Sequence, residues 1–213
     1  MNAEYSRPAD INKFFAQCNL NLHIGFYNDH KHLVSNQISK IDQELQKPGL
    51  DAKRKKDIEF TKLFYLTSYR QHMIVNCFLT MYSHFEECLG VTCHLCSKTM
   101  PQNKRSGLIR FKEHFEREHS VNVSQGLQWT FLRDCEKARD VLLHAAGNIT
   151  LARNRQKVED LPKRNPTLFG IDNSRIFPKE DLLVRFSHAI PEFIDWLTDQ
   201  IENGNTTTGS NVP

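Results

Sequence analysis

Leu132 to Asn148 reads LRDCEKARDVLLHAAGN, and this stretch decides the fold that we expect for the rest of the chain. Its apolar residues recur every three or four positions, which is typical of an amphipathic helix. The Gly-Asn pair that ends the stretch suits a helix C-cap. His144 is therefore expected in the last turn, one turn after Asp140 and with Arg139 at the flank of the same face. A proton donor or acceptor, an anion that can orient it and a permanent cation meet at one helix end.

The run Arg139-Asp140-Val141-Leu142-Leu143-His144 resembles the R-x4-6-H motif of HEPN domains, small all-helical domains that are common in prokaryotic toxin and phage-defence systems. Trp129 before the motif, Gly147 after it and a final amphipathic helix also resemble that family's layout, over residues 20–202. The residue after the arginine is often asparagine in the family and is aspartate here. The tyrosine that some family toxins carry two residues after the histidine is replaced by Ala146.

The resemblance implies a metal-independent endoribonuclease without a cofactor. It implies RNA as the substrate, a homodimer whose two motif helices face each other across a cleft, and an antitoxin protein as a further partner. The chemistry of the residues fits these roles. His144 can give and take protons near neutral pH, Asp140 can fix its tautomer, and Arg139 can hold two phosphate oxygens with its planar fork. These three residues are the predicted catalytic set.

Four residues beyond the motif are predicted to bind substrate. They are Asn148, Arg153, Arg155 and Lys157. The three cations would hold RNA phosphates without reading bases, and the alternative is that they form a solvated basic face. The motif residues also have a simpler interpretation, because an exposed Asp-His pair on a helix is common. A non-catalytic HEPN module that binds RNA, a nucleotide or a protein partner therefore stays open.

The composition indicates a globular protein rather than a membrane or secreted one. The chain has 213 residues, a net charge of +3 and a pI near 8.5, which permits binding to a polyanion without demanding it. No apolar run approaches the length of a membrane span, and the N-terminus has no secretory pattern. We therefore expect a cytoplasmic protein whose six cysteines stay reduced.

Apolar periodicity predicts an all-α helical bundle, and the resemblance implies that this bundle is HEPN-like. The principal helices are expected at 21–46, 58–98, 124–146 and 179–202, with a break in the second near Ser68 or Gly90. A shorter helix is expected at 108–120 and a brief extended piece at 174–177. The domain organisation that follows is an N-terminal segment 1–20, a helical domain 21–202 and a disordered tail 203–213.

Cys93-x2-Cys96 followed by His114 and His119 has the ligand types of a zinc site, which would make the chain a zinc-stabilised nucleic-acid-binding protein. Packing is the favoured interpretation, because both cysteines continue a helical apolar stripe and no glycine or proline turns the chain between them. We therefore predict no metal, and zinc stays the alternative.

Overall fold

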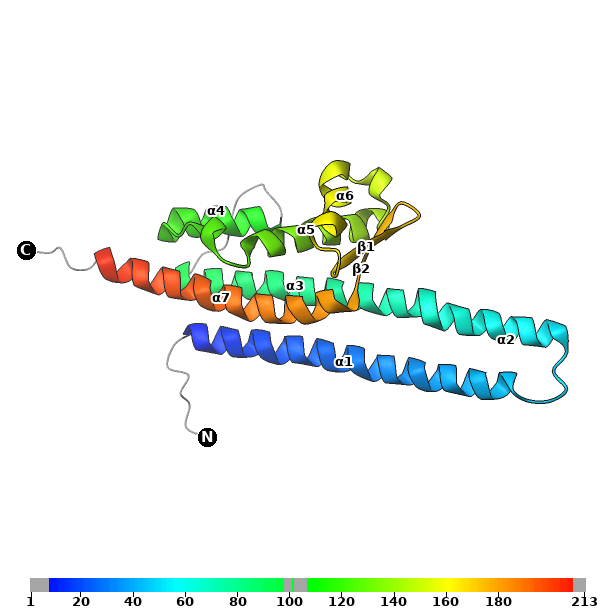
Figure 1. The fold of residues 1–213 in the computed structure, drawn as a ribbon. Helices are drawn as coiled ribbons and strands as arrows, with labels where there is room; N and C mark the ends of the chain where they lie inside the picture. Colours follow the sequence, from blue (N-terminus) through cyan, green and yellow to red (C-terminus); the bar gives the residue numbers. More distant parts are fainter. Residues whose placement is uncertain (1–7, 98–100, 102–106, 209–213) are drawn as a thin grey trace, which may run out of the picture.

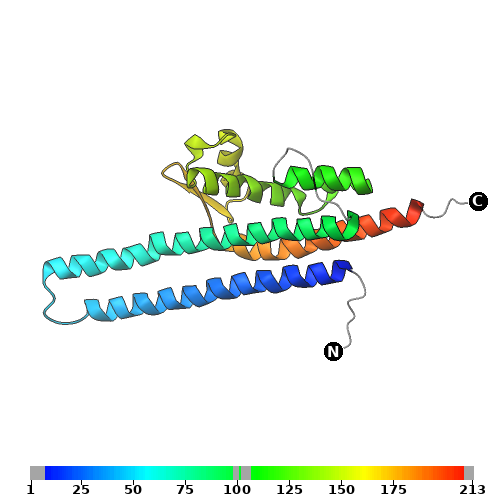
Figure 2. The same cartoon turned by 180° about the vertical axis from the view of Figure 1, so that it is seen from behind.

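The computed structural model describes residues 8–97, 101 and 107–208, and there the chain is mostly helical with one two-stranded sheet. Figures 1 and 2 show α3 and α7 side by side, with α1 on one side of them and α4 and α5 on the other. The elements in chain order are α1 (Pro8–Leu45), α2 (Ala52–Phe64), the π-helical η1 (Tyr65–Tyr69), α3 (Arg70–Ser97), α4 (Leu108–His119), the 3₁₀ turn η2 (Val123–Gln125), α5 (Trp129–Ala145), the 3₁₀ turn η3 (Ile149–Leu151), α6 (Arg155–Arg164), β1 (Phe169–Asp172), β2 (Arg175–Pro178) and α7 (Glu180–Thr208).

The first helix is longer than the sequence pattern predicts. It begins at Pro8 and continues to Leu45, so no break separates residues 1–20 from the helical domain among the residues described. The reason is a single buried stripe with spacings of four and seven residues, formed by Ala16, Leu20, Tyr27, Val34 and Ile41.

The second predicted helix begins earlier and is interrupted once. Asp51 caps α2, because its carboxylate accepts a hydrogen bond from the Arg54 amide at 2.8 Å. The interruption is η1, which includes Ser68, so that one of the two expected break positions is confirmed. At the alternative position, Gly90, α3 is a regular helix.

Aromatic packing between α3 and α7 forms the centre of the core. The ring of Phe186 lies 5.5 Å from Phe78, 5.9 Å from Tyr82 and 6.1 Å from Phe85, centroid to centroid. All four side chains are fully buried. Ring contacts of this kind stabilise a fold by more than the burial of their apolar area alone. They therefore fix how α3 and α7 lie against each other.

The motif helix begins at Trp129, five residues later than predicted. Ser124, where the predicted helix starts, lies in η2, and Gly126 follows it. A Cβ at Gly126 would stand 2.8 Å from the Trp196 ring on α7, so the chain crosses α7 too closely for a side chain there. This close approach delays the start of α5.

The hairpin of β1 and β2 confirms the extended piece expected at 174–177. The strands pair antiparallel, with Phe169 opposite Pro178 and Asp172 opposite Arg175. The hairpin adds a small sheet to a fold that we predicted to be all-α, and it lies against the end of α5 (Figure 1).

The last helix continues through Pro191 and ends at Thr208. The prediction of a disordered tail from 203 is therefore wrong for 203–208, and 209–213 lie outside the described residues. Extending an existing helix adds one backbone hydrogen bond per residue, so a few polar residues can continue it without apolar contacts. Among the residues described, no helix has the length and apolarity to cross a membrane.

Candidate functional site at the end of α5

Burial of one face of α5 determines which way the motif points. Leu132, Cys135, Ala138 and Val141 lie in the core, as their spacing predicts. Arg139 is one residue past this stripe and is directed towards α3, where its side chain is 22% exposed.

Two carboxylates hold the Arg139 guanidinium. One nitrogen donates to Glu86 Oε2 at 3.0 Å and the other to Asp140 Oδ1 at 2.8 Å. The guanidinium carbon also lies 5.2 Å from the centre of the Tyr82 ring, in a cation–π contact. Burial alone would lower the pKa of Arg139, but the Asp140 hydrogen bond and the Glu86 charge outweigh burial and raise the pKa. The cation is therefore fixed in place and permanently charged.

Asp140 is bound to Arg139, and we expected it to orient His144. Within the described residues, the hydrogen bond that it makes is the one to Arg139, and no hydrogen bond or ion pair joins it to His144. The expectation is wrong in this structure because a charged neighbour competes for the carboxylate. A charge-assisted hydrogen bond at 2.8 Å is stronger than one to a neutral imidazole.

His144 lies in the last turn of α5 with its side chain exposed. No hydrogen bond of this imidazole occurs in the part of the chain that the structure describes. The helix ends immediately after it, where Ala146 (φ 48°) and Gly147 (φ 81°) have left-handed backbone conformations. His144 is thus accessible to a ligand.

The hairpin holds this helix end in place. The Ile176 amide donates to the Gly147 carbonyl at 2.9 Å, and Arg175 reaches the Ala146 carbonyl at 3.4 Å. A Cβ on Gly147 would stand 2.8 Å from the Ile176 carbonyl oxygen. Glycine is therefore required here by both its backbone conformation and the close approach of β2.

The four predicted substrate-binding residues do not join the motif. The Asn148 side chain caps η3, accepting from the Thr150 amide at 3.0 Å. Arg153, Arg155 and Lys157 are exposed, and Arg155 pairs with Glu159 along α6 at 2.7 Å. Among the described residues, no hydrogen bond or ion pair connects these four to the motif.

Sequence reasoning missed the α3 side of the site. Tyr82 and Glu86 are four residues apart on α3 and lie more than fifty residues before Arg139. Their spacing places them on one helix face, but no sequence pattern links that face to α5. Glu136, one turn before Asp140, is a further acidic neighbour. Burial raises its pKa, and it accepts a hydrogen bond from the Leu108 amide at 2.7 Å.

The four residues of the zinc alternative lie where α3 ends beside α4. Cys93 is fully buried in the core, as packing predicts, and burial raises the pKa of its thiol to about 12. The Nε2 atoms of His114 and His119 lie 3.3 and 2.6 Å from the Ser97 hydroxyl. Within the described residues, no three His, Cys, Asp or Glu side chains are grouped so that they could hold a metal ion.

Comparisons with known proteins add no relative. The chain matches no family model, no curated protein and no solved structure. The arrangement of Arg139, Glu86, Asp140 and His144 is therefore the basis for any functional conclusion.

Proposed function

We propose that this chain is a HEPN-like, metal-independent endoribonuclease of a toxin or phage-defence system. The observation that carries the proposal is the position of Arg139 and His144 at one helix end. The arginine is fixed by Glu86 and Asp140, and the histidine is exposed just over one turn later. Metal-free cleavage of a phosphodiester uses a group that stabilises negative charge and a group that transfers protons, and a fixed guanidinium and an accessible imidazole are groups of these two kinds.

The RNA supplies its own nucleophile in this reaction. The 2′-oxygen loses its proton to a base and attacks phosphorus, the bond to the 5′-oxygen breaks, and that oxygen receives a proton. His144 gives or takes one of these protons. Arg139 binds the non-bridging oxygens and stabilises the extra charge of the transition state, which is worth about 3–4 kcal/mol for a preorganised group. A phosphate would displace Asp140, the more exposed of the two carboxylates, while Glu86 keeps its contact.

A second imidazole would come from a second chain. The resemblance implies a homodimer with facing motif helices and an antitoxin protein as regulator. Leu143, which precedes His144, is 51% exposed and offers apolar surface for the contact between chains. Arg153, Arg155 and Lys157 would then hold phosphates outside the reacting centre.

A non-catalytic module is the second candidate, and one observation favours it. Both carboxylates that hold Arg139 already neutralise its charge. If neither yields to a phosphate, Arg139 has a structural role, and the exposed surface around His144 serves to bind a partner.

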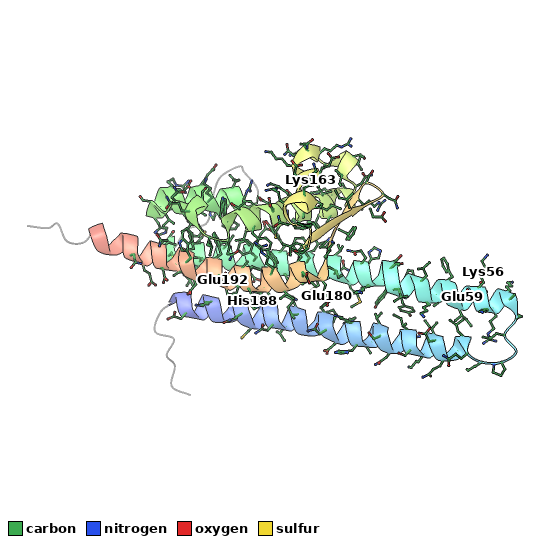
Figure 3. The ribbon with its side chains drawn as sticks, in the orientation of Figure 1. Lys56, Glu59, Lys163, Glu180, His188 and Glu192 are labelled. Atoms are coloured by element: carbon green, nitrogen blue, oxygen red, sulfur yellow. The ribbon has the colours of Figure 1, made fainter. Side chains whose placement is uncertain are left out.

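RNA cleavage in the presence of EDTA tests the proposal. We expect products with 2′,3′-cyclic phosphate and 5′-hydroxyl ends. His144→Ala should remove cleavage, whereas His188→Ala on the exposed side of α7 is the matched control and should keep it (Figure 3). Arg139→Lys keeps the charge without the planar fork, and it should lower the rate even if Arg139→Ala unfolds.

Cleavage by His144→Ala at the wild-type rate would overturn the catalytic assignment. Absence of cleavage by the wild-type chain, together with RNA binding that His144→Ala weakens, would establish the non-catalytic module instead.

A further inference from the structure

A two-helix arm extends beyond the body of the molecule. It consists of residues 31–70, which lie past the point where Lys31 and Arg70 both contact Glu180 at the start of α7. Figure 3 shows Lys56 and Glu59 at the far end of this arm, away from Glu180. No helix of the body covers α2 in Figures 1 and 2. The structure describes α2 in full, and none of its residues is buried.

Large apolar side chains are exposed along the arm and at its base. They include Leu22, Phe26 and Leu33 on α1, and Phe60 and Phe64 on α2, with exposures between 46% and 72%. These five residues and Tyr69 are called the arm patch. Globular proteins rarely expose contiguous apolar surface of this extent unless a partner covers it.

Phe26, Tyr69 and Phe64 link the two helices within the arm patch. The three α1 residues fall within an arc of about 40°, because each residue advances the helix by about 100°. Phe64 and Tyr69 are ring neighbours, with centroids 6.4 Å apart, and Tyr69 and Phe26 line the same cavity. The extra residue of the π-helical η1 is what brings Tyr69 next to Phe64.

A cavity of about 380 Å³ opens at the base of this patch, between α1 and α3. Its walls include Phe26, Tyr69, His72 and Met73. The arm patch therefore combines projecting rings on α2 with a hollow beside α1. A surface that carries both a projection and a hollow can bind an identical surface, because a two-fold axis places each projection against the partner's hollow.

We propose that a second copy of this chain covers the arm patch. The two arms pack face to face, and their four helices form a bundle in which each arm buries the apolar stripe of the other. This contact lies apart from the end of α5, so it is a separate surface from the motif-helix contact of the proposed ribonuclease and does not rest on that activity.

The size of the patch agrees with a stable dimer. Aromatic side chains bury roughly 150–250 Å² each, so the exposed fractions of the three phenylalanines amount to roughly 270–450 Å² per chain, and the two leucines and the other cavity walls add further apolar area. Stable interfaces bury about 800 Å² per partner. The arm patch spans two helices and the groove between them. A partner that offers a single helix would therefore cover less of it than a second copy of the arm.

Light scattering on the full chain tests the pairing. The wild type should self-associate at micromolar concentration, as a dimer through the arm patch alone or as a larger assembly where the motif helices pair as well, and Phe60→Glu with Phe64→Glu should raise the dissociation constant of the arm contact at least a hundredfold. Since α2 has no buried residue in the described chain, circular dichroism should show the wild-type helix content. Leu127→Glu is the matched control, because Leu127 is 90% exposed outside the arm and should leave the dimer unchanged.

Two results would overturn the proposal. One is a monomeric wild type. The other is a dimer that persists in the Phe60→Glu, Phe64→Glu variant but dissociates in Leu143→Glu, which would assign the interface to the motif helix. RNA cleavage measured on the same variants separates this outcome from a failure of the proposed function, since Phe60→Glu with Phe64→Glu leaves the end of α5 unchanged and should keep cleavage.

Discussion

At the scale of single residues, the contact that matters most is the one between Arg139 and Glu86. It joins α5 to α3 and holds the guanidinium against α3. Asp140 binds the other side of the fork but is about half exposed. In the proposed mechanism Glu86 is thus the positioning residue and Asp140 the exchangeable one.

Replacing Glu86 by Gln should hold the Arg139 guanidinium less firmly but leave it in the same place. The amide still accepts a hydrogen bond but no longer attracts the cation. Hydrogen bonds to charged groups are worth about 1.5–3 kcal/mol, so we expect kcat for RNA cleavage to fall by about tenfold or more with a smaller change in KM. Steady-state kinetics measure this.

Glu87→Gln is the control for this prediction. Glu87 is exposed one residue further along α3 and contacts His84 rather than Arg139. Equal losses in both variants would show that Glu86 acts only through general charge.

At the scale of elements, the joint between α5 and β2 determines how exactly the motif is placed. Gly147→Ala should destabilise the fold in two ways, because alanine is strained at φ 81° and its Cβ would meet the Ile176 carbonyl oxygen at 2.8 Å. Gly49→Ala shares the positive φ (85°) but meets open space. We expect about 1 kcal/mol for Gly49→Ala from strain alone, and about 2–4 kcal/mol for Gly147→Ala.

Urea unfolding of both variants checks the difference. Similar free energies of unfolding would mean that β2 moves aside easily, and that the hairpin does not fix the end of α5.

The elements themselves were largely predictable, since periodic apolar residues determine α4, α5 and α7 by local rules. The hairpin strand was predicted as well, but its contact with Gly147 was not. Backbone pairing between distant segments produces no periodic pattern in the amino-acid sequence. The α3 half of the site was missed for the same reason. Asp140 had two favourable partners within reach, and periodicity alone could not decide between Arg139 and His144.

At the scale of the whole molecule, buried histidines make stability depend on pH. Burial lowers the pKa values of His23, His114 and His119 below the ordinary 6.5. The unfolded chain then binds more protons than the folded one as pH falls through that value, so the free energy of unfolding should decrease on acidification. Denaturant unfolding at a series of pH values from neutral to mildly acidic measures this.

Glu136 opposes this effect. Burial raises its pKa, so its contribution to stability is complete below its unfolded pKa and is lost as pH rises through the folded value. His114→Gln should therefore flatten the pH dependence, and Glu136→Gln should steepen it. Stability that rises on acidification in the wild type would contradict the prediction.

Glu180 marks a boundary in how the molecule opens. Its carboxylate, in the first turn of α7, binds Lys31 from α1 and Arg70 from α3. Burial alone would raise the pKa of Glu180, but the hydrogen bonds and charges of these two cations outweigh burial and lower the pKa. In the body, exposing a backbone amide to solvent requires the aromatic core to open. In the arm, it requires only α1 and α2 to open. In a single chain, amide hydrogens of α2 should exchange with solvent deuterium well before those of α3 around Phe78 and Phe85. The same carboxylate that fastens the arm thus separates a segment that can fray and reform by itself from one that opens only when the whole protein unfolds.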